Sequence, residues 1–217
     1  MLLKVVVVVL HSPSKTIKCW SCTQQTTPLL FCERCQSILD YPVDLSLSHF
    51  DIFKITEHLL IDETELRTKF YHLSKQVHPD RFTMAVHPAP LYALRWSTAL
   101  NRAYQTLKNQ QDRTHLVIER YIGHSDALAK AAIPTDLAES YFEIQDLLSE
   151  GQVEPILNFK KELESLLMES QQTWHKLAAE FDSGFNKTKS AEDLRTHANR
   201  EKYLRSMLLD IERKVNS

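Results

Sequence analysis

The chain, 217 residues long, is organised around Val77-His78-Pro79-Asp80-Arg81-Phe82 and the run that leads into it. Between residues 63 and 77 the apolar side chains recur every three or four positions, as on one face of a helix: Leu66, Phe70, Leu73 and Val77. Pro79 is expected to end that helix, because proline has no amide hydrogen and pushes the residue before it out of the α region. The sequence therefore predicts a helix that is followed by a stiff, exposed corner carrying an imidazole and a carboxylate.

The helices expected on either side of this corner indicate what kind of domain contains it. By itself, a His-Pro-Asp tripeptide most often marks an ordinary proline-ended loop. Here a short helix is expected to open at residues 47–53, and a long one is expected over residues 94–107. The order of short helix, long helix, corner and long helix resembles the J-domain co-chaperones over about residues 49–107. The matching positions are His78, Pro79 and Asp80 in the corner and Asn101, Ala103, Tyr104 and Leu107 in the last helix.

The resemblance implies a partner and a docking surface. J-domain proteins act on the ATPase domain of a seventy-kilodalton heat-shock chaperone, so the corner is expected to contact such a chaperone. Basic residues on the outer face of the second helix are the family's docking surface, and this helix is less basic than many of its kind. The candidates on that face are Arg67 and Lys75, with Lys69 and His72 beside them.

Apolar residues of the three helices are expected to form the core of the J domain. Between the corner and the third helix, Pro88 and Pro90 predict a stiff connector over residues 83–90. The expected core residues are Phe50, Ile52, Phe53, Leu59, Leu60, Leu66, Phe70, Leu73, Leu100, Ala103, Tyr104 and Leu107.

Composition describes a soluble, mainly helical protein. The chain is 43% hydrophobic and 25% charged, with only 3 Gly and 8 Pro. A formal net charge of -2 argues against general nucleic-acid binding, which needs a basic surface to neutralise phosphates. Residues 46–124 carry 10 Lys and Arg against 8 Asp and Glu, whereas residues 135–217 carry 11 against 16. The two parts are therefore expected to present different surfaces.

The first ten residues, Met1 to Leu10, are apolar but are interrupted by Lys4. The run falls far short of the roughly 20 residues that a membrane-spanning helix needs, so no membrane contact is expected. It has one basic residue and no convincing small-residue cleavage site for a secretory signal, and it lacks the arginines of a mitochondrial transit peptide. A strand or a frayed leader is compatible with this composition.

Four cysteines, the only ones in the chain, form two Cys-x-x-Cys knuckles: Cys19, Cys22, Cys32 and Cys35. Such a pair of knuckles can direct four thiolates at one tetrahedral ion and leaves no open position for a substrate, so the site is expected to be structural. Zinc is the favoured ion; an iron centre of the rubredoxin kind, two disulfides or free thiols are the alternatives. A module this small cannot bury much apolar surface, so the metal is expected to hold residues 17–40 folded.

Downstream of the J domain, the apolar spacing predicts further helices. One is expected from Lys108 to a C-cap at Gly123, and three more are expected after Pro134, with Thr135 or Asp136 capping the first and Gly151 and Gly184 at the junctions. Their apolar stripes predict an antiparallel three-helix bundle. The expected fold class is therefore mainly α, in three parts: a metal module at 17–40, a J domain with a connector helix at 46–122 and the bundle at 134–217.

This order of parts resembles the HscB/Jac group of J-domain co-chaperones, some of which carry a tetracysteine module ahead of the J domain. The resemblance implies that the protein binds an iron–sulfur cluster scaffold protein, delivers it to the heat-shock chaperone and stimulates ATP hydrolysis. It also implies a location in the mitochondrial matrix in a eukaryote or in the cytoplasm of a bacterium.

By the same resemblance, the scaffold-binding face lies on the first and third helices of the bundle. Positions at three- and four-residue steps share one face of the first helix, and Glu139 departs from the apolar residue usual there. The opposing interpretation places Phe142 in the core and leaves the acids merely solvated. The expected face comprises Ala138, Phe142, Glu143, Asp146 and Glu150, with Tyr203 from the third helix.

Two other classes of function compete with this hypothesis. A general protein-folding J protein would need a Gly/Phe-rich linker or a β-rich client domain, and the chain offers neither. An enzyme would need a nucleophile with its base or an open metal position, and four cysteine ligands leave none. The chain is therefore expected to be a binding protein rather than an enzyme.

Overall fold

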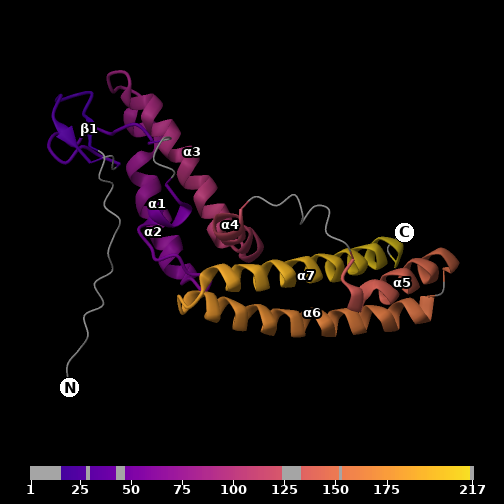
Figure 1. The fold of residues 1–217 in the computed structure, drawn as a ribbon. Helices are drawn as coiled ribbons and strands as arrows, with labels where there is room; N and C mark the ends of the chain where they lie inside the picture. Colours follow the sequence, from indigo (N-terminus) through magenta and orange to yellow (C-terminus); the bar gives the residue numbers. More distant parts are fainter. Residues whose placement is uncertain (1–15, 28–29, 43–46, 124–132, 152, 216–217) are drawn as a thin grey trace. The chain divides into compact units, whose positions relative to one another are not determined.

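The computed structural model describes residues 16–27, 30–42, 47–123, 133–151 and 153–215 (Figure 1). The chain packs into two compact units: residues 1–56 with 63–105, and residues 57–62 with 106–217. The predicted J domain at 46–122 is thus divided between the two units. The predicted division into three functional parts stays a prediction.

The first unit begins with the cysteine module. Strands β1 (Ile17–Lys18) and β2 (Gln25–Thr26) pair antiparallel, with Ile17 opposite Thr26. A single antiparallel bridge joins Phe31 to Ile38 across the second knuckle. Each Cys-x-x-Cys pair therefore sits at the tip of a small hairpin.

The helices of the first unit are α1 (His49–Phe53), α2 (Glu63–Val77) and α3 (Ala89–Lys108), with the 3-10 turn η2 (Pro79–Phe82) before α3. Ser48 and Asp51 cap α1 reciprocally, each side chain bonding the other's backbone amide. The end of α2 at Val77 confirms the prediction made from Pro79. Phe50, Phe53 and Leu66 are buried.

The third helix starts five residues earlier than expected, at Ala89. The connector is therefore shorter than the expected residues 83–90, since Pro90 belongs to the first turn of α3. A proline is tolerated in a first helical turn because the amide hydrogen that it lacks would form no bond within the helix. Further along α3, Tyr104 stacks on Phe70 of α2 with 4.0 Å between ring centroids. This contact holds α2 and α3 together near the expected core positions.

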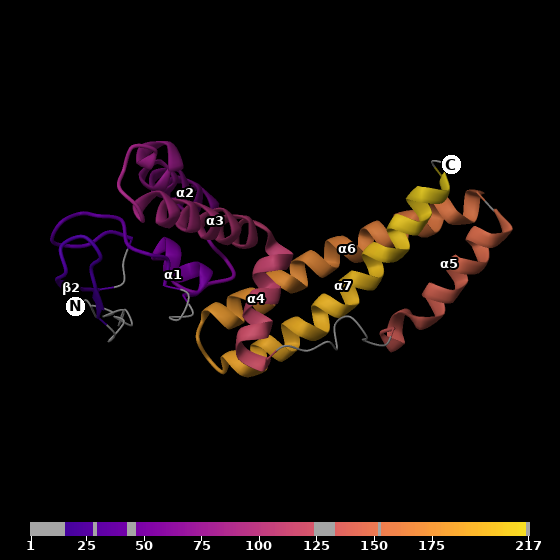
Figure 2. The same cartoon turned by 90° about the horizontal axis from the view of Figure 1, so that it is seen from above.

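The second unit is built from α4 (Gln110–Ile122), the turn η3 (Thr135–Leu137), α5 (Ala138–Glu150), α6 (Val153–Asp182) and α7 (Lys187–Val215). Gly123, Gly151 and Gly184 lie at the ends of α4, α5 and α6 with positive φ, as the sequence predicts. The helices α6 and α7 run side by side, with α5 along one end and α4 across the other (Figure 2).

Two clusters of buried apolar side chains hold other helices against the long α6–α7 pair. The first contains Leu137, Ile144, Leu163 and Leu204, and it joins α5 to α6 and α7 as the predicted three-helix bundle. The second contains Val117 and Ile118 of α4 with residues of α6 and α7: Trp174, Ala178, Phe181 and Leu194. The helix α4 thus serves as a fourth packing partner, because α5 is too short to cover the whole α6–α7 face.

Three local expectations were wrong. Leu59 is buried, but in the second cluster of the second unit rather than in the J-domain core. Leu60 is exposed. Neither Thr135 nor Asp136 caps α5, since no side chain forms a capping hydrogen bond at the start of that helix. The Asp136 carboxylate instead accepts a hydrogen bond from the Arg200 guanidinium at 2.8 Å.

The apolar residues 1–10 lie outside the described residues. Within the ranges that the structure describes, none of the helices has the length and apolar character to cross a membrane.

Candidate functional site

The His-Pro-Asp corner is a tightly bonded turn. The Arg81 amide donates to the His78 carbonyl at 3.0 Å, and the Thr83 hydroxyl donates to the Asp80 carbonyl at 3.1 Å. The Asp80 amide donates to His78 Nδ1 at 3.3 Å, and Arg81 donates from its guanidinium to the Lys75 carbonyl at 3.0 Å. These bonds fix the backbone of the corner against the end of α2.

The corner leaves its carboxylate free for a partner. The Asp80 side chain is 85% exposed, and one of its oxygens lies 3.5 Å from His78 Nδ1. A carboxylate held on a fixed, exposed turn loses little conformational freedom when it accepts a hydrogen bond from a cation. The geometry therefore suits recognition of a positively charged group.

The exposed face of α2 leads up to this corner. Arg67 and Lys75 are both exposed and lie eight residues apart, so they share a helix face with Tyr71 between them. The Arg67 guanidinium lies 5.6 Å from the centre of the Tyr71 ring, and the ring is half-exposed. Tyr71 was not expected from the sequence, although its four-residue distance from each basic residue was the available signal.

The two other basic candidates of α2 have local partners. Lys69 pairs with Glu65 at 2.7 Å and donates to the Lys54 carbonyl at 3.1 Å. His72 shares a hydrogen bond of 2.9 Å with the Gln76 side chain. The residues of the expected docking face that have no local partner of this kind among the described residues are therefore Arg67 and Lys75, with Tyr71 between them.

The four cysteines form a second candidate site. Cys19, Cys22, Cys32 and Cys35 place their sulfur atoms within 4.8 Å of one another, which is close enough to bind one metal ion. The Cys19–Cys35 and Cys22–Cys32 sulfur pairs are 3.6 and 3.8 Å apart. A tetrahedral ion with metal–sulfur bonds of about 2.3 Å would separate its ligands by roughly 3.8 Å, whereas a disulfide bond measures about 2.05 Å.

The two knuckles repeat one backbone geometry. In each, the amide of the first cysteine donates a hydrogen bond to the carbonyl five residues ahead, from Cys19 to Gln24 and from Cys32 to Ser37, both at 2.9 Å. The residue after the second cysteine has a left-handed backbone, at Thr23 (φ 61°) and Gln36 (φ 59°). This repeated turn aims both thiols of a knuckle at the same point.

Local hydrogen bonding favours the thiolate form at two ligands, since the backbone amides of Cys35 and Arg34 lower the pKa of the Cys32 thiol, whereas the pKa of the Cys22 thiol is raised to about 11. The hydroxyl and then the amide of Ser37 lower the pKa of the Cys35 thiol to about 6. A cation binds the thiolate rather than the thiol, so Cys35 is already prepared as a ligand at neutral pH. The chemistry of the four donors therefore fits a tetrahedral metal ion.

The cysteine module packs against α3. The Trp96 indole donates to the Leu39 carbonyl at 2.9 Å, and Arg95 forms an ion pair with Asp40 at 2.6 Å. Tyr41 meets the Trp96 ring edge to face at 5.0 Å. The module and the J-domain helices therefore belong to one packing unit, a relationship that Cys-x-x-Cys spacing could not predict.

The structure places four of the expected scaffold-binding residues on the outside of α5. Phe142 is 61% exposed, so it is not a core residue, and the expected acids Glu143, Asp146 and Glu150 are exposed too. Ala138 and Tyr203 are half-buried, and Tyr203 packs against the first apolar cluster. The Tyr141 ring meets both Phe142 and Tyr203 edge to face, at 5.8 and 6.1 Å, and so links the two helices.

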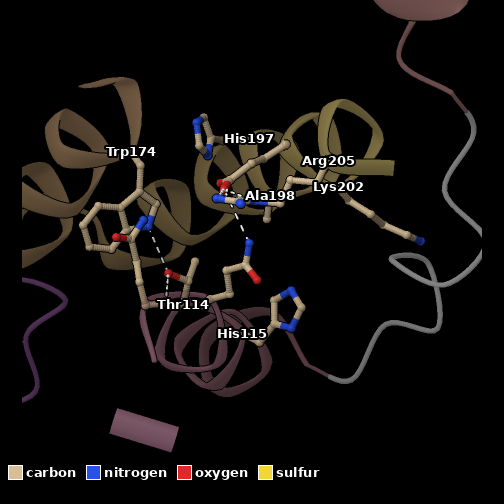
Figure 3. Close-up of a pocket in the computed structure, with 10 residues that line it drawn as sticks. Thr114, His115, Trp174, His197, Ala198, Lys202 and Arg205 are labelled. Carbon is tan, nitrogen blue, oxygen red and sulfur yellow. Dashed lines mark hydrogen bonds and ion pairs between the residues drawn. The ribbon is translucent and has the colours of Figure 1, made fainter. Parts of the chain in front are cut away.

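A cleft of about 400 Å³ opens between α4, α6 and α7 (Figure 3). Two of its side chains form an ion pair, since Glu201 accepts from Arg205 at 2.6 Å, and Glu201 also accepts from Gln111 at 3.4 Å. On its floor the Trp174 indole donates to the Thr114 hydroxyl at 3.0 Å. These bonds are those of a packing seam between helices. The cleft is lined by Gln110, Gln111, Thr114, His115, Trp174, His197, Ala198, Glu201, Lys202 and Arg205.

Comparison with known proteins identifies proteins that are similar in sequence to this chain. No family model matches the chain. A co-chaperone protein HscB homolog from Paraburkholderia phytofirmans is 32% identical over 146 residues, which cover 65% of this chain and 82% of that protein. The homolog from Burkholderia mallei is 31% identical over 148 residues, with the same coverage of both chains.

Solved structures show the same fold at lower identity. The crystal structure of human co-chaperone protein HscB superimposes with a TM-score of 0.72 at 20% identity and covers 92% of this chain and 98% of that one. Chaperone HscB from Vibrio cholerae gives a TM-score of 0.56 at 19% identity, over 78% of this chain and 98% of that one. With its corner, its tetracysteine module and its helical second unit, the chain belongs to the HscB family of co-chaperones.

Proposed function

We propose that this protein binds an iron–sulfur cluster scaffold protein, delivers it to a seventy-kilodalton heat-shock chaperone and stimulates the ATPase of that chaperone. The observation that carries the proposal is the exposed Asp80 carboxylate on a bonded corner at the end of a helix with Arg67 and Lys75 on its outer face. Membership of a co-chaperone family supports the same role. The protein itself is proposed not to be an enzyme.

In this role Asp80 acts by presenting a charge in a fixed position. A cationic group of the chaperone would donate a charge-assisted hydrogen bond to the Asp80 carboxylate, and such a bond is about twice as strong as a neutral one. Arg67, Tyr71 and Lys75 would extend the same contact along α2. If the corner binds the ATP-hydrolysing conformation of the chaperone more tightly than its other conformations, binding shifts the chaperone towards that conformation.

The experiment is a measurement of ATP turnover by a chaperone of this class with and without the full chain. Wild-type protein should stimulate turnover, and Asp80→Asn, which keeps the shape but removes the charge, should lose most of the stimulation. His78→Gln is an independent test of the corner. Undiminished stimulation by a folded Asp80→Asn variant would reject the role of this residue.

We infer that the metal at the four cysteines is zinc and that its role is structural. Four sulfur ligands saturate a tetrahedral ion, so no position remains for a substrate or an activated water. The ion would replace the apolar core that such a small module lacks. Cys19, Cys22, Cys32 and Cys35 would each supply one ligand.

The scaffold protein is proposed to bind the outer face of α5. Phe142 offers a large apolar side chain among Glu143, Asp146 and Glu150, with Ala138 four residues before it, and the Tyr141 ring contacts both Phe142 and Tyr203 of α7. Aromatic side chains commonly anchor interfaces, while surrounding charges steer the approach of a partner of opposite sign. A scaffold protein with a basic, partly apolar surface fits this face.

A further inference from the structure

Immediately after the corner, three consecutive apolar residues face solvent: Met84, Ala85 and Val86. Met84 is 96% exposed and Val86 is 78% exposed. A long apolar side chain that projects this far contributes nothing to the core of the unit. In Figure 1 this segment lies at the free end of the α2–α3 pair, in the loop at the top of the picture.

The segment has a defined backbone. The Ala85 amide donates to the Phe82 carbonyl at 3.0 Å, and the Ala89 amide donates to the Val86 carbonyl at 3.1 Å. These two turns connect it without interruption to η2 on one side and to α3 on the other. The exposed side chains are therefore displayed from a bonded loop.

The apolar segment lies within reach of any partner that binds Asp80. Four residues separate Asp80 from Met84, so their backbones are at most about 14 Å apart even if the chain were fully extended. A protein interface of standard size covers about 800 Å² on each partner, which corresponds to a disc of roughly 16 Å radius. An interface centred on the Asp80 carboxylate is therefore large enough to include Met84.

We propose that Met84 and Val86 form an apolar anchor that docks on the heat-shock chaperone next to the group that receives Asp80. This inference rests on the proposed function, and it specifies the partner surface: a cationic group for Asp80 with an apolar depression beside it. Exposed apolar side chains that become buried at an interface supply affinity without dependence on charge. With few basic residues on α2, such an anchor compensates for weak electrostatic docking.

The test is the concentration of this protein that gives half-maximal stimulation of the chaperone ATPase, measured for the full chain. Met84→Ser with Val86→Ser should raise that concentration about tenfold or more and leave the maximal stimulation near that of wild type. The matched control is Phe185→Ser, which removes an equally exposed side chain (85%) from the α6–α7 turn and should change nothing. Both changes are at solvent-exposed positions, where folding is expected to be preserved.

Salt provides a second measurement. Raising the ionic strength from about 0.05 to 0.5 M should raise the half-maximal concentration of wild type and of the double variant by the same factor. Salt screens the charged contacts of Asp80, Arg67 and Lys75, and it does not screen an apolar contact. An equal half-maximal concentration for wild type and the double variant, or a difference that disappears at high salt, would overturn the anchor. Absence of any stimulation by the wild-type chain would instead reject the proposed function itself.

Discussion

At the scale of single residues, the metal module contains two residues whose backbone conformation is unfavourable. Thr23 and Gln36 follow the second cysteine of each knuckle and have φ angles of 61° and 59°. The left-handed region costs a residue with a Cβ roughly 1–2 kcal/mol, and a β-branched residue such as threonine is especially rare there. The knuckle turn therefore imposes a cost on the module at both positions.

Thr23→Gly should tighten zinc binding. Glycine removes the steric cost but loses more entropy on folding, so a net gain of about 1 kcal/mol is expected, or roughly fivefold in affinity. The gain reports on zinc because the module is expected to fold only with its ion. Competition against a chromophoric zinc chelator measures it, on protein first shown by metal analysis to hold one equivalent of zinc.

Gln24→Gly is the matched control for this prediction. Gln24 is the next residue along and does not have a positive φ, so glycine there should weaken zinc binding or leave it unchanged. If both glycine variants behave alike, the left-handed turn is not the cause. Less than about half an equivalent of zinc, with two disulfides by mass, would remove the metal assignment altogether.

At the scale of elements, α5 bears the proposed scaffold contact. Phe142→Ala should weaken binding of the scaffold protein at least about tenfold, because an exposed aromatic anchor would be lost. Tyr203→Ala is less clean, since Tyr203 packs on the apolar cluster of α5, α6 and α7 and its loss would also destabilise the unit. Calorimetric titration of the scaffold protein into each variant measures the effect.

Met168→Ala supplies the control for α5. Met168 is a similarly exposed apolar residue, but it lies on α6. Its removal should leave scaffold binding unchanged. If Phe142→Ala binds as wild type while remaining folded, the outer face of α5 is not the interface.

The elements also show what the sequence could and could not predict. Helix α2 ends where Pro79 requires, and the glycines mark the ends of α4, α5 and α6, because these are local rules of backbone conformation. The start of α3 was placed too late, since proline is tolerated in a first helical turn as well as in a loop. Local rules decide helix ends only where one conformation is permitted.

The candidate sites were predictable to the extent that their residues are close in sequence. The corner and the cysteine knuckles each depend on short spacing, and the structure brings both sets together. The burial of Leu59 depends on side chains more than fifty residues away, and apolar periodicity does not specify which core a residue enters. Tyr71 and Met84 were not expected because exposure, not residue type, makes them candidates.

At the scale of the whole molecule, residues 57–62 stand between α1 and α2 in sequence but belong to the second unit. Asp182 accepts from the amides of Leu59 and Leu60 at 2.7 and 2.8 Å, and Arg113 donates to the Leu59 carbonyl at 2.9 Å. Glu57 accepts from the Tyr121 hydroxyl at 2.6 Å. Burial, followed by this hydrogen bond, raises the pKa of Tyr121 to about 12.

Leu59→Ala should therefore destabilise the second unit. Removal of a fully buried leucine side chain typically lowers the free energy of unfolding by about 2–5 kcal/mol. Leu60→Ala is the neighbouring control, and because Leu60 is exposed it should cost less than about 1 kcal/mol. Denaturant unfolding followed by far-UV circular dichroism, to which the long helices of the second unit contribute strongly, measures both. Equal effects of the two variants would show that the segment is not anchored in this core.

The anchored segment also limits how this protein can be divided. The backbone passes from one unit to the other three times, after residues 56, 62 and 105, so neither unit is a single uninterrupted piece of polypeptide. A truncated gene that encodes only residues 46–122 would produce Leu59 without the α6 and α7 side chains that cover it. A gene fusion with a single breakpoint therefore cannot transfer either unit whole.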